Sequence, residues 1–173
     1  MRIALKDKDL LKSACLVNGA WVTARPGATL DVTNPADGSV VGRVPMMSPE
    51  EIPEVIEASR IAQADWAAWP AKERAAVLRR WFDLLTEHTA DLALIMTLEQ
   101  GKPLHEAQGE IAYAASFIEW FAEEAKRIYG DIIPAPKREQ RITVLRQPIG
   151  VTAAITPWNF PAAMLTRTGA VGA

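Results

Sequence analysis

The strongest constraint on the fold is a long stretch of helix-forming sequence between Ser48 and Gly130, which fills almost half of the 173 residues. Apolar residues recur in it at steps of three and four, which is the spacing of one face of an α-helix. The stretch opens on "SPEE", where Ser48 is the expected N-cap, Pro49 the first helical residue and Glu51 the second member of a capping box. The sequence therefore predicts a layer of long helices whose apolar faces need a cover.

This helical stretch is divided at residues that end helices. The apolar pattern runs from Pro70 to about Glu99, with an expected break near Thr89. Gly101 stands where a left-handed C-cap is expected, and Pro103 stands where the next helix begins. The last long helix is predicted from Leu104 to Tyr129.

Short strands are predicted before and after the helices. Asn18-Gly19 in "LVNGAWV" supplies the positive φ values of a type I′ hairpin, and "LDVTNPADGSVVGRVP" predicts a second hairpin that turns between Pro35 and Gly38. Both are expected to be edge strands that lie against something larger. Only "VTAAIT", residues 151–156, has the composition of a strand buried on both faces, as parallel sheets require. The element order thus indicates the α/β class.

Composition and charge exclude several functions. Nineteen Lys and Arg against 21 Asp and Glu give a net charge of −2, spread along the chain, which argues against a nucleic-acid partner. The charged N-terminus is not a secretory signal, and the charge-free run 147–166 contains prolines and polar residues that a membrane helix would not tolerate. One cysteine, Cys15, and two histidines give neither a disulfide nor a metal site. We expect a cytoplasmic protein without a metal.

The turn "TPWNFP" directly follows the predicted buried strand. Its side chains should therefore stand at the carboxyl end of that strand, where open α/β sheets bind their ligands. Asn159 carries a neutral amide, which is a good donor to an oxyanion. A rigid loop between two prolines with a packed Trp158 explains the same residues, so both interpretations stay open at this point. Arg167 alone predicts only an exposed helix residue.

The motifs taken together resemble a known family. "ITPWNFP", with "TLEQGKP" at 97–103 and "QPIGV" at 147–151, resembles the aldehyde dehydrogenase superfamily. "GEIAYAASFIEWFAEEAKRIYGD", "NPADG" and "AMLTR" resemble its bacterial NAD(P)-dependent succinate-semialdehyde dehydrogenases. The resemblance runs from about Leu16 to Arg167. It implies the N-terminal part of that fold, incomplete, with edge hairpins, long helices and the first strand of the cofactor-binding domain.

The resemblance and the local patterns divide the chain into five regions. They are an N-terminal arm (1–15), a β-hairpin region (16–47), a helical layer of the cofactor-binding domain (48–130), a bridging or oligomerisation strand region (131–150), and the first buried strand with its turn and following helix (151–173).

Site residues are implied only where this sequence matches the family motifs. In the family, the segment that matches Ile155, Thr156, Pro157, Trp158 and Asn159 lies along the nicotinamide side of NAD or NADP. Asn159 is then also the catalytic donor to the substrate oxygen. Arg167 matches the arginine that grips the far carboxylate of succinate semialdehyde, a task suited to a guanidinium.

Other family features are absent from the 173 residues. The catalytic cysteine and glutamate of the family fall beyond the matched residues, and Cys15 matches no family nucleophile. The lysine near the adenine ribose and most of the cofactor-binding sheet also come later. We therefore expect no activity from this chain alone and no firm binding of NAD or NADP. Which of the two cofactors the family member uses stays open.

From Thr168 onward the sequence departs abruptly from the family pattern, which suggests a shifted reading frame or a disrupted gene. Three hypotheses remain. The chain belongs to an oxidoreductase of homo-oligomeric type, or it is a helical interaction module that self-associates or binds an intact homologue, or it is a truncated remnant without function.

Overall fold

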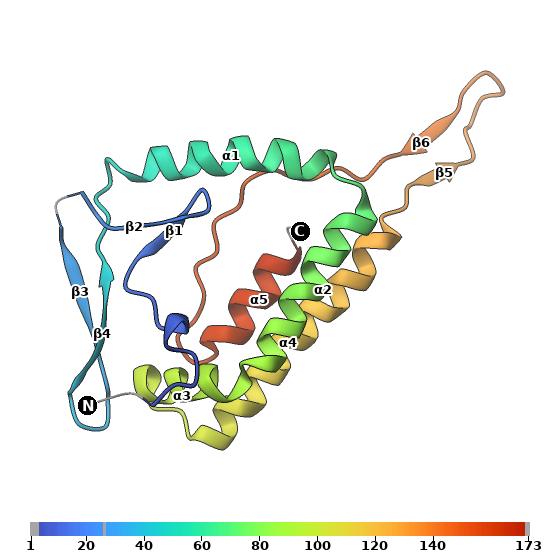
Figure 1. Ribbon diagram of the computed structural model, residues 1–173. Helices are drawn as coiled ribbons and strands as arrows, with labels where there is room; N and C mark the ends of the chain where they lie inside the picture. Colours follow the sequence, from blue (N-terminus) through green and yellow to red (C-terminus); the bar gives the residue numbers. More distant parts are fainter. Residues whose placement is uncertain (1–3, 26, 172–173) are drawn as a thin grey trace.

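Helices packed around one central helix form the body of the protein (Figure 1). The computed structural model describes residues 4–25 and 27–171. The central helix is α4, and its neighbours are α2, α3 and α5. Their bounds are Ala71–Glu87 for α2, Thr89–Gln100 for α3, Leu104–Glu124 for α4 and Pro161–Val171 for α5. Although α5 comes last in the sequence, it lies beside α4, and its end reaches the core cluster to which α2 contributes (Figure 1).

Small side chains let these helices approach closely. Ile118 of α4 is fully buried, and Leu78 of α2 and Ala170 of α5 pack in the same cluster. A second cluster joins Met96 of α3 to Ile111 of α4. Most other buried apolar side chains are alanines, at positions 24, 75, 93, 107, 114, 115, 122, 125 and 163. The core therefore lies on the faces that α4 presents to its three neighbours.

The predicted helix boundaries are largely confirmed. The break expected near Thr89 occurs at His88, between α2 and α3. Gly101 adopts φ 84° and ends α3 as the expected left-handed C-cap. The last long helix stops earlier than predicted, because α4 gives way to a 3-10 turn, η2, Ala125–Arg127.

Helix α1, Ile52–Ala68, differs more from its prediction. It begins at Ile52 rather than Pro49, and Pro53 lacks the N–H that a regular turn would donate to Pro49. Glu51 still accepts from the Ser48 N–H at 2.8 Å, as the capping box predicts. None of the residues of α1 is buried, and the helix lies apart from the helical body (Figure 1). Its apolar face thus lacks a cover among the described elements.

The strands form three separate antiparallel pairs within the described residues. Their bounds are Cys15–Val17 with Ala20–Val22 (β1 and β2), Thr29–Thr33 with Val40–Pro45 (β3 and β4), and Asp131–Ile133 with Ile142–Val144 (β5 and β6). Asn18 and Gly19 have φ 48° and 77°, which confirms the predicted type I′ turn. The β5–β6 hairpin projects away from the helices (Figure 1).

The strand predicted at residues 151–156 is not formed. The segment is irregular, and the side chain of Ile155 is 99% exposed instead of buried on both faces. A parallel strand needs neighbouring strands to bond its backbone and helices to cover its faces. The described residues offer no partner strand to this segment, so the apolar run "VTAAIT" remains largely exposed to solvent.

The N-terminal arm is held by a carboxylate of α3. Asp91 is buried and accepts the backbone N–H groups of Lys6 at 3.1 Å and Asp7 at 2.8 Å. The arm continues into a short 3-10 turn, η1, Lys8–Leu10. These hydrogen bonds, that from Asp7 first, lower the pKa of the Asp91 carboxyl. A segment that the sequence showed only as a charged arm is thus fixed to the helical body.

The turn between β3 and β4 rests on the end of α3. Asn34 is buried, and its Oδ1 accepts from the Ala36 N–H at 3.0 Å, which shapes the "NPADG" turn. Pro35 then lies against Gly101 so closely that a Cβ built on Gly101 would stand 2.9 Å from Pro35 Cγ. Two motifs that are far apart in sequence therefore meet here, and only glycine fits at position 101.

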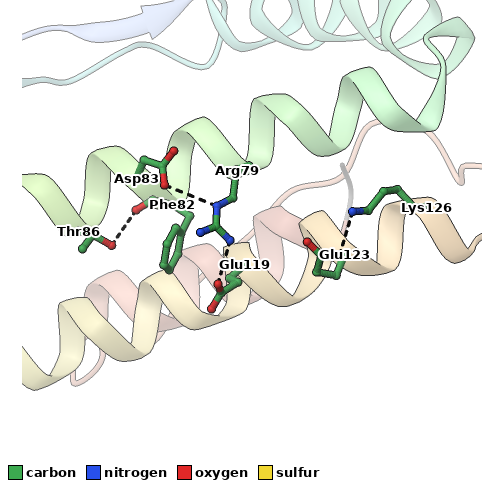
Figure 2. Close-up of polar contacts among 7 residues, drawn as sticks. All are labelled: Arg79, Phe82, Asp83, Thr86, Glu119, Glu123 and Lys126. Atoms are coloured by element: carbon green, nitrogen blue, oxygen red, sulfur yellow. Dashed lines mark hydrogen bonds and ion pairs between the residues drawn. The ribbon is translucent and has the colours of Figure 1, made fainter.

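An exposed ion pair on the surface of the helical body links α2 to α4 (Figure 2). Arg79 Nη1 lies 2.9 Å from Glu119 Oε1, and its guanidinium stands 4.5 Å from the centre of the Phe82 ring. Asp83 adds a longer contact, at 3.6 Å. The Arg79 and Glu119 side chains are about half exposed, so such a pair contributes roughly 0–1 kcal/mol.

The Asp91 contact predicts a pH-dependent stability. The pKa of the Asp91 carboxyl is lowered in the folded state from its ordinary value of 3.8. At a pH above 3.8 this carboxyl therefore stabilises the fold, and its contribution is lost as the pH falls through the folded-state pKa. Asp91→Asn should therefore destabilise the chain at neutral pH, and its difference from wild type should shrink below about pH 4. Urea unfolding at a series of pH values measures this. A difference that stays constant over the whole series would contradict the assignment.

The Gly101 contact predicts a matched pair of glycine variants. Gly101→Ala places a Cβ in a left-handed conformation and against Pro35, and should lower the free energy of unfolding by about 1–2 kcal/mol. Gly169→Ala is the control, because Gly169 lies in α5 with open space around it and should gain about 0.5–1 kcal/mol. Equal effects of the two substitutions in chemical denaturation would show that Gly101 is not under this constraint.

Candidate functional site

The turn that carries the predicted site residues leads directly into helix α5. Pro161 is the first residue of α5, and the turn before it contains Trp158 and Asn159. Both side chains are exposed, Trp158 to 78%, so the tryptophan is not packed inside a rigid loop. Ile155, Pro157 and Asn159 are exposed as well, and Thr156 is half-buried. The five residues predicted to line the nicotinamide therefore present an open and largely apolar surface.

A buried carboxylate from α4 holds the beginning of α5. Glu110 Oε1 accepts from the backbone N–H groups of Ala162 at 3.0 Å and Ala163 at 3.3 Å. These groups belong to the first turn of α5, where helix N–H groups have no partner within the helix. A negative charge there also interacts favourably with the helix dipole. Glu110 therefore acts as the cap of α5 from outside the helix.

Lys102 connects this carboxylate to the turn. Its Nζ forms an ion pair with Glu110 Oε2 and donates to the backbone oxygen of Asn159 at 2.9 Å. The same ammonium stands 4.4 Å from the centre of the Phe160 ring. The side chain of Lys102 is 10% exposed and that of Glu110 is 1% exposed. The "EQGKP" loop, α4 and the "PWNF" turn are thus joined by one buried ion pair.

An open pocket of about 590 Å³ lies at this junction. It is lined by Gln100, Gly101, Lys102, Pro103, Glu106, Gly109, Glu110, Tyr113, Asn159 and Phe160. The charge of Lys102 is compensated by Glu110, and Glu106 adds a second carboxylate. The pocket therefore does not offer a net positive charge to an anionic ligand.

The structure does not bring Arg167 into this pocket. Arg167 is exposed on α5, six residues after Pro161, which is about 9 Å along a helix axis. No ion pair joins it to another residue in the described part of the chain. Its guanidinium is consequently available to a ligand or to a further part of a larger protein.

Sequence reasoning missed Glu110 and Lys102, although both lie within motifs that were recognised. A signal existed for Glu110, because Ala107 and Ala114 lie three residues before and four after it, on the same helix face, and both are buried. A charge within an apolar stripe indicates a buried partner. Lys102 has two partners, Glu110 eight residues away and the backbone oxygen of Asn159 57 residues away, and no local pattern could supply the second.

Two further properties hold for residues 4–25 and 27–171. No cluster of three or more His, Cys, Asp or Glu side chains is arranged to hold a metal ion there. None of the helices in this part of the chain combines the length and apolar character that crossing a membrane requires.

Comparison with known proteins identifies the family. Residues 21–172 match the aldehyde dehydrogenase family. The chain is 60% identical over 163 residues to the succinate-semialdehyde dehydrogenase [NADP(+)] GabD of Escherichia coli K12, and 61% identical over 163 residues to the glutarate-semialdehyde dehydrogenase of Pseudomonas putida KT2440. Each alignment covers 94% of this chain and 34% of the relative, so the chain spans about a third of their length.

A solved structure gives the same result for the fold. The crystal structure of an aldehyde dehydrogenase from Brucella melitensis biovar abortus 2308 matches with a TM-score of 0.97 and 66% identity, over 99% of this chain and 35% of that one. The mixed α/β arrangement of hairpins and long helices is therefore that of the N-terminal third of such enzymes, and the chain belongs to the aldehyde dehydrogenase family.

Proposed function

We propose that this chain is the N-terminal portion of an NAD(P)-dependent dehydrogenase that oxidises succinate semialdehyde, or a closely related aldehyde, to the carboxylate. The observation that carries the proposal is the identity of about 60% to relatives named for succinate and glutarate semialdehydes. The reaction also needs a thiol nucleophile and a base for the deacylating water. By family resemblance these groups lie outside the residues matched here, so we propose that the chain alone is inactive.

In this proposal Asn159 donates to the oxygen of the reacting carbonyl. Its side chain is exposed, and its backbone oxygen is held by Lys102 at 2.9 Å. An amide that is held through its backbone and has no other partner for its side chain can donate to a developing oxyanion without breaking an existing hydrogen bond. This supports the role of a catalytic residue for Asn159.

Arg167 is the better of two nearby cations for the far carboxylate of the substrate. Lys102 is nearly buried, and Glu110 already neutralises its charge. Arg167 is exposed, and within the described structure no carboxylate occupies its guanidinium. A guanidinium also binds a carboxylate through two parallel hydrogen bonds, which an ammonium cannot do.

The residues at 155–159 fit the nicotinamide part of the cofactor. NAD or NADP would supply the hydride acceptor of the reaction. The open apolar surface of Ile155, Pro157 and Trp158 suits a flat ring, and no described segment covers it. We propose that these residues, with Thr156 and Asn159, line that ring, and that the chain alone holds the cofactor weakly.

A second candidate function is an interaction module. The β5–β6 hairpin projects from the helical body (Figure 1). The apolar side chains of Ile132, Leu145 and Ile149, in and after this hairpin, are exposed. Several exposed large apolar side chains in one projecting segment are typical of association sites. We propose that the chain self-associates through this region or binds an intact homologue there.

A hybrid enzyme tests the catalytic proposal. Residues 16–167 of this chain would replace the matching third of E. coli GabD, with the unmodified 173-residue chain as the inactive control. Asn159→Ala should lower kcat by about 10²–10³-fold with little change in KM, because the lost donor acts on the transition state. Arg167→Gln should lower kcat/KM by roughly tenfold to a hundredfold for succinate semialdehyde but not for butanal, which lacks the carboxylate.

Two results would contradict this assignment. Steady NAD(P)H formation by the 173-residue chain alone would show that the missing groups are not needed. An Arg167→Gln loss of equal size for both aldehydes would show that Arg167 does not bind the carboxylate.

Association of the isolated chain is the test of the second candidate. Light scattering should give a mass above that of one 18.9 kDa chain, and the substitutions Ile132→Ser and Leu145→Ser should return it to a monomer. Ile61→Ser is the control, because Ile61 is an exposed apolar residue on helix α1, outside the β5–β6 hairpin. Dissociation by the control variant as well would indicate nonspecific aggregation rather than a defined interface.

A further inference from the structure

Glu110 is a charged residue at a buried position. It lies on the buried face of α4, and the carboxylate would be costly there without partners. Both of its oxygens are occupied. Oε1 takes the two N–H groups of α5, while Oε2 takes the ammonium of Lys102. Every bond of this carboxylate therefore leads, directly or through Lys102, to residues on either side of Phe160.

Lys102 is itself placed by a rigid neighbour. Gly101 before it has a left-handed conformation and is in close contact with Pro35, which limits how the loop can move. From this position Lys102 Nζ reaches the backbone oxygen of Asn159. The turn is thus fixed at Asn159 from the α3–α4 loop and at Ala162 from α4, three residues further along.

Asn159 has little backbone freedom between these two anchors, yet its side chain is exposed. This combination separates it from residues that are merely packed. The anchors bind backbone atoms and leave the amide of Asn159 without a partner in the described structure. Holding the backbone while leaving the side chain available is what a donor to a transition state requires.

We propose that Glu110, acting with Lys102, is a positioning residue that fixes the backbone at Asn159 and so the position from which its side chain extends. Glu110 does so by binding the first turn of α5 and by holding the ammonium that binds the backbone oxygen of Asn159. The purpose of this positioning rests on the function proposed above for Asn159. The positioning itself can be tested on the chain without any enzymatic assay.

Nuclear magnetic resonance on the 173-residue chain provides that test. In Glu110→Gln the neutral amide oxygen is a weaker acceptor, so hydrogen exchange at the Ala162 and Ala163 amides should become about tenfold faster. Lys102→Met should leave those amides protected, because Glu110 still binds them, but should shift the carbonyl ¹³C resonance of Asn159. The amides of Leu78 and Ile118 report on the core and should change less than about twofold in either variant.

Glu119→Gln is the matched control. Glu119 is on the same helix and also pairs with a basic side chain, but that pair is half exposed and joins α4 to α2 rather than to α5 (Figure 2). It should alter neither the Ala162 and Ala163 amides nor the Asn159 carbonyl. An equal effect of Glu119→Gln on these signals would overturn the proposal. So would equal acceleration at Leu78 and Ile118, which indicates a general packing role, or unchanged signals at Ala162, Ala163 and Asn159.

The hybrid enzyme then separates this proposal from the proposed function. If Asn159 acts through its position, Lys102→Met should lower kcat by at least about tenfold in the hybrid and have no further effect in an Asn159→Ala background. Full activity of Asn159→Ala would contradict the proposed function while leaving the nuclear magnetic resonance result on positioning intact. A large loss with Asn159→Ala and none with Lys102→Met would overturn the positioning proposal alone.

Discussion

The ion pair between Lys102 and Glu110 is the interaction on which the C-terminal part of this structure depends. Helix α5 follows a segment that has no partner strand, so residues 151–156 are not held in a sheet that could fix the start of the helix. Its small buried side chains, such as Ala163 and Ala170, add little apolar area. Beside its packing on α4, the hydrogen bonds from the N–H groups of its first turn to Glu110 therefore fix where α5 begins. Breaking one partner of such a buried pair would leave the other charge uncompensated.

The same device recurs at two other places. Glu51, Asp91 and Glu110 are the buried acidic residues of the described chain, and each accepts two backbone N–H groups. Glu51 ties Arg25 to the start of α1, Asp91 ties the N-terminal arm to α3, and Glu110 ties α5 to α4. A carboxylate can satisfy two donors that regular secondary structure leaves unpaired. Irregular segments are thus attached to helices where apolar contact alone is sparse.

This pattern explains which parts of the structure could be predicted from sequence. The Asn18-Gly19 hairpin and the Gly101 cap were predictable because their signals lie within a few residues and depend on local backbone conformation. The roles of Asn159 and Arg167 were predicted from the resemblance to a family, because one turn and one arginine do not by themselves indicate a function. Glu110 and Lys102 were missed because the backbone groups that they bind in α5 and in the turn before it lie 52 to 57 residues away, and only the folded chain brings them together.

For the strand expected at 151–156, the local sequence pattern predicted an element that the structure does not form. Its composition is that of a strand in a parallel sheet, where neighbouring strands and helices cover both faces. The apolar composition of a segment thus indicates the neighbours that it requires. Among the described residues no strand lies beside it, and the apolar side chains stay exposed. The turn that follows is nonetheless held, because its anchors come from α4 and the α3–α4 loop rather than from a sheet. The backbone geometry of the Asn159 turn is therefore a property of the helical body, whereas the surface that would face a nicotinamide depends on neighbours of residues 151–156.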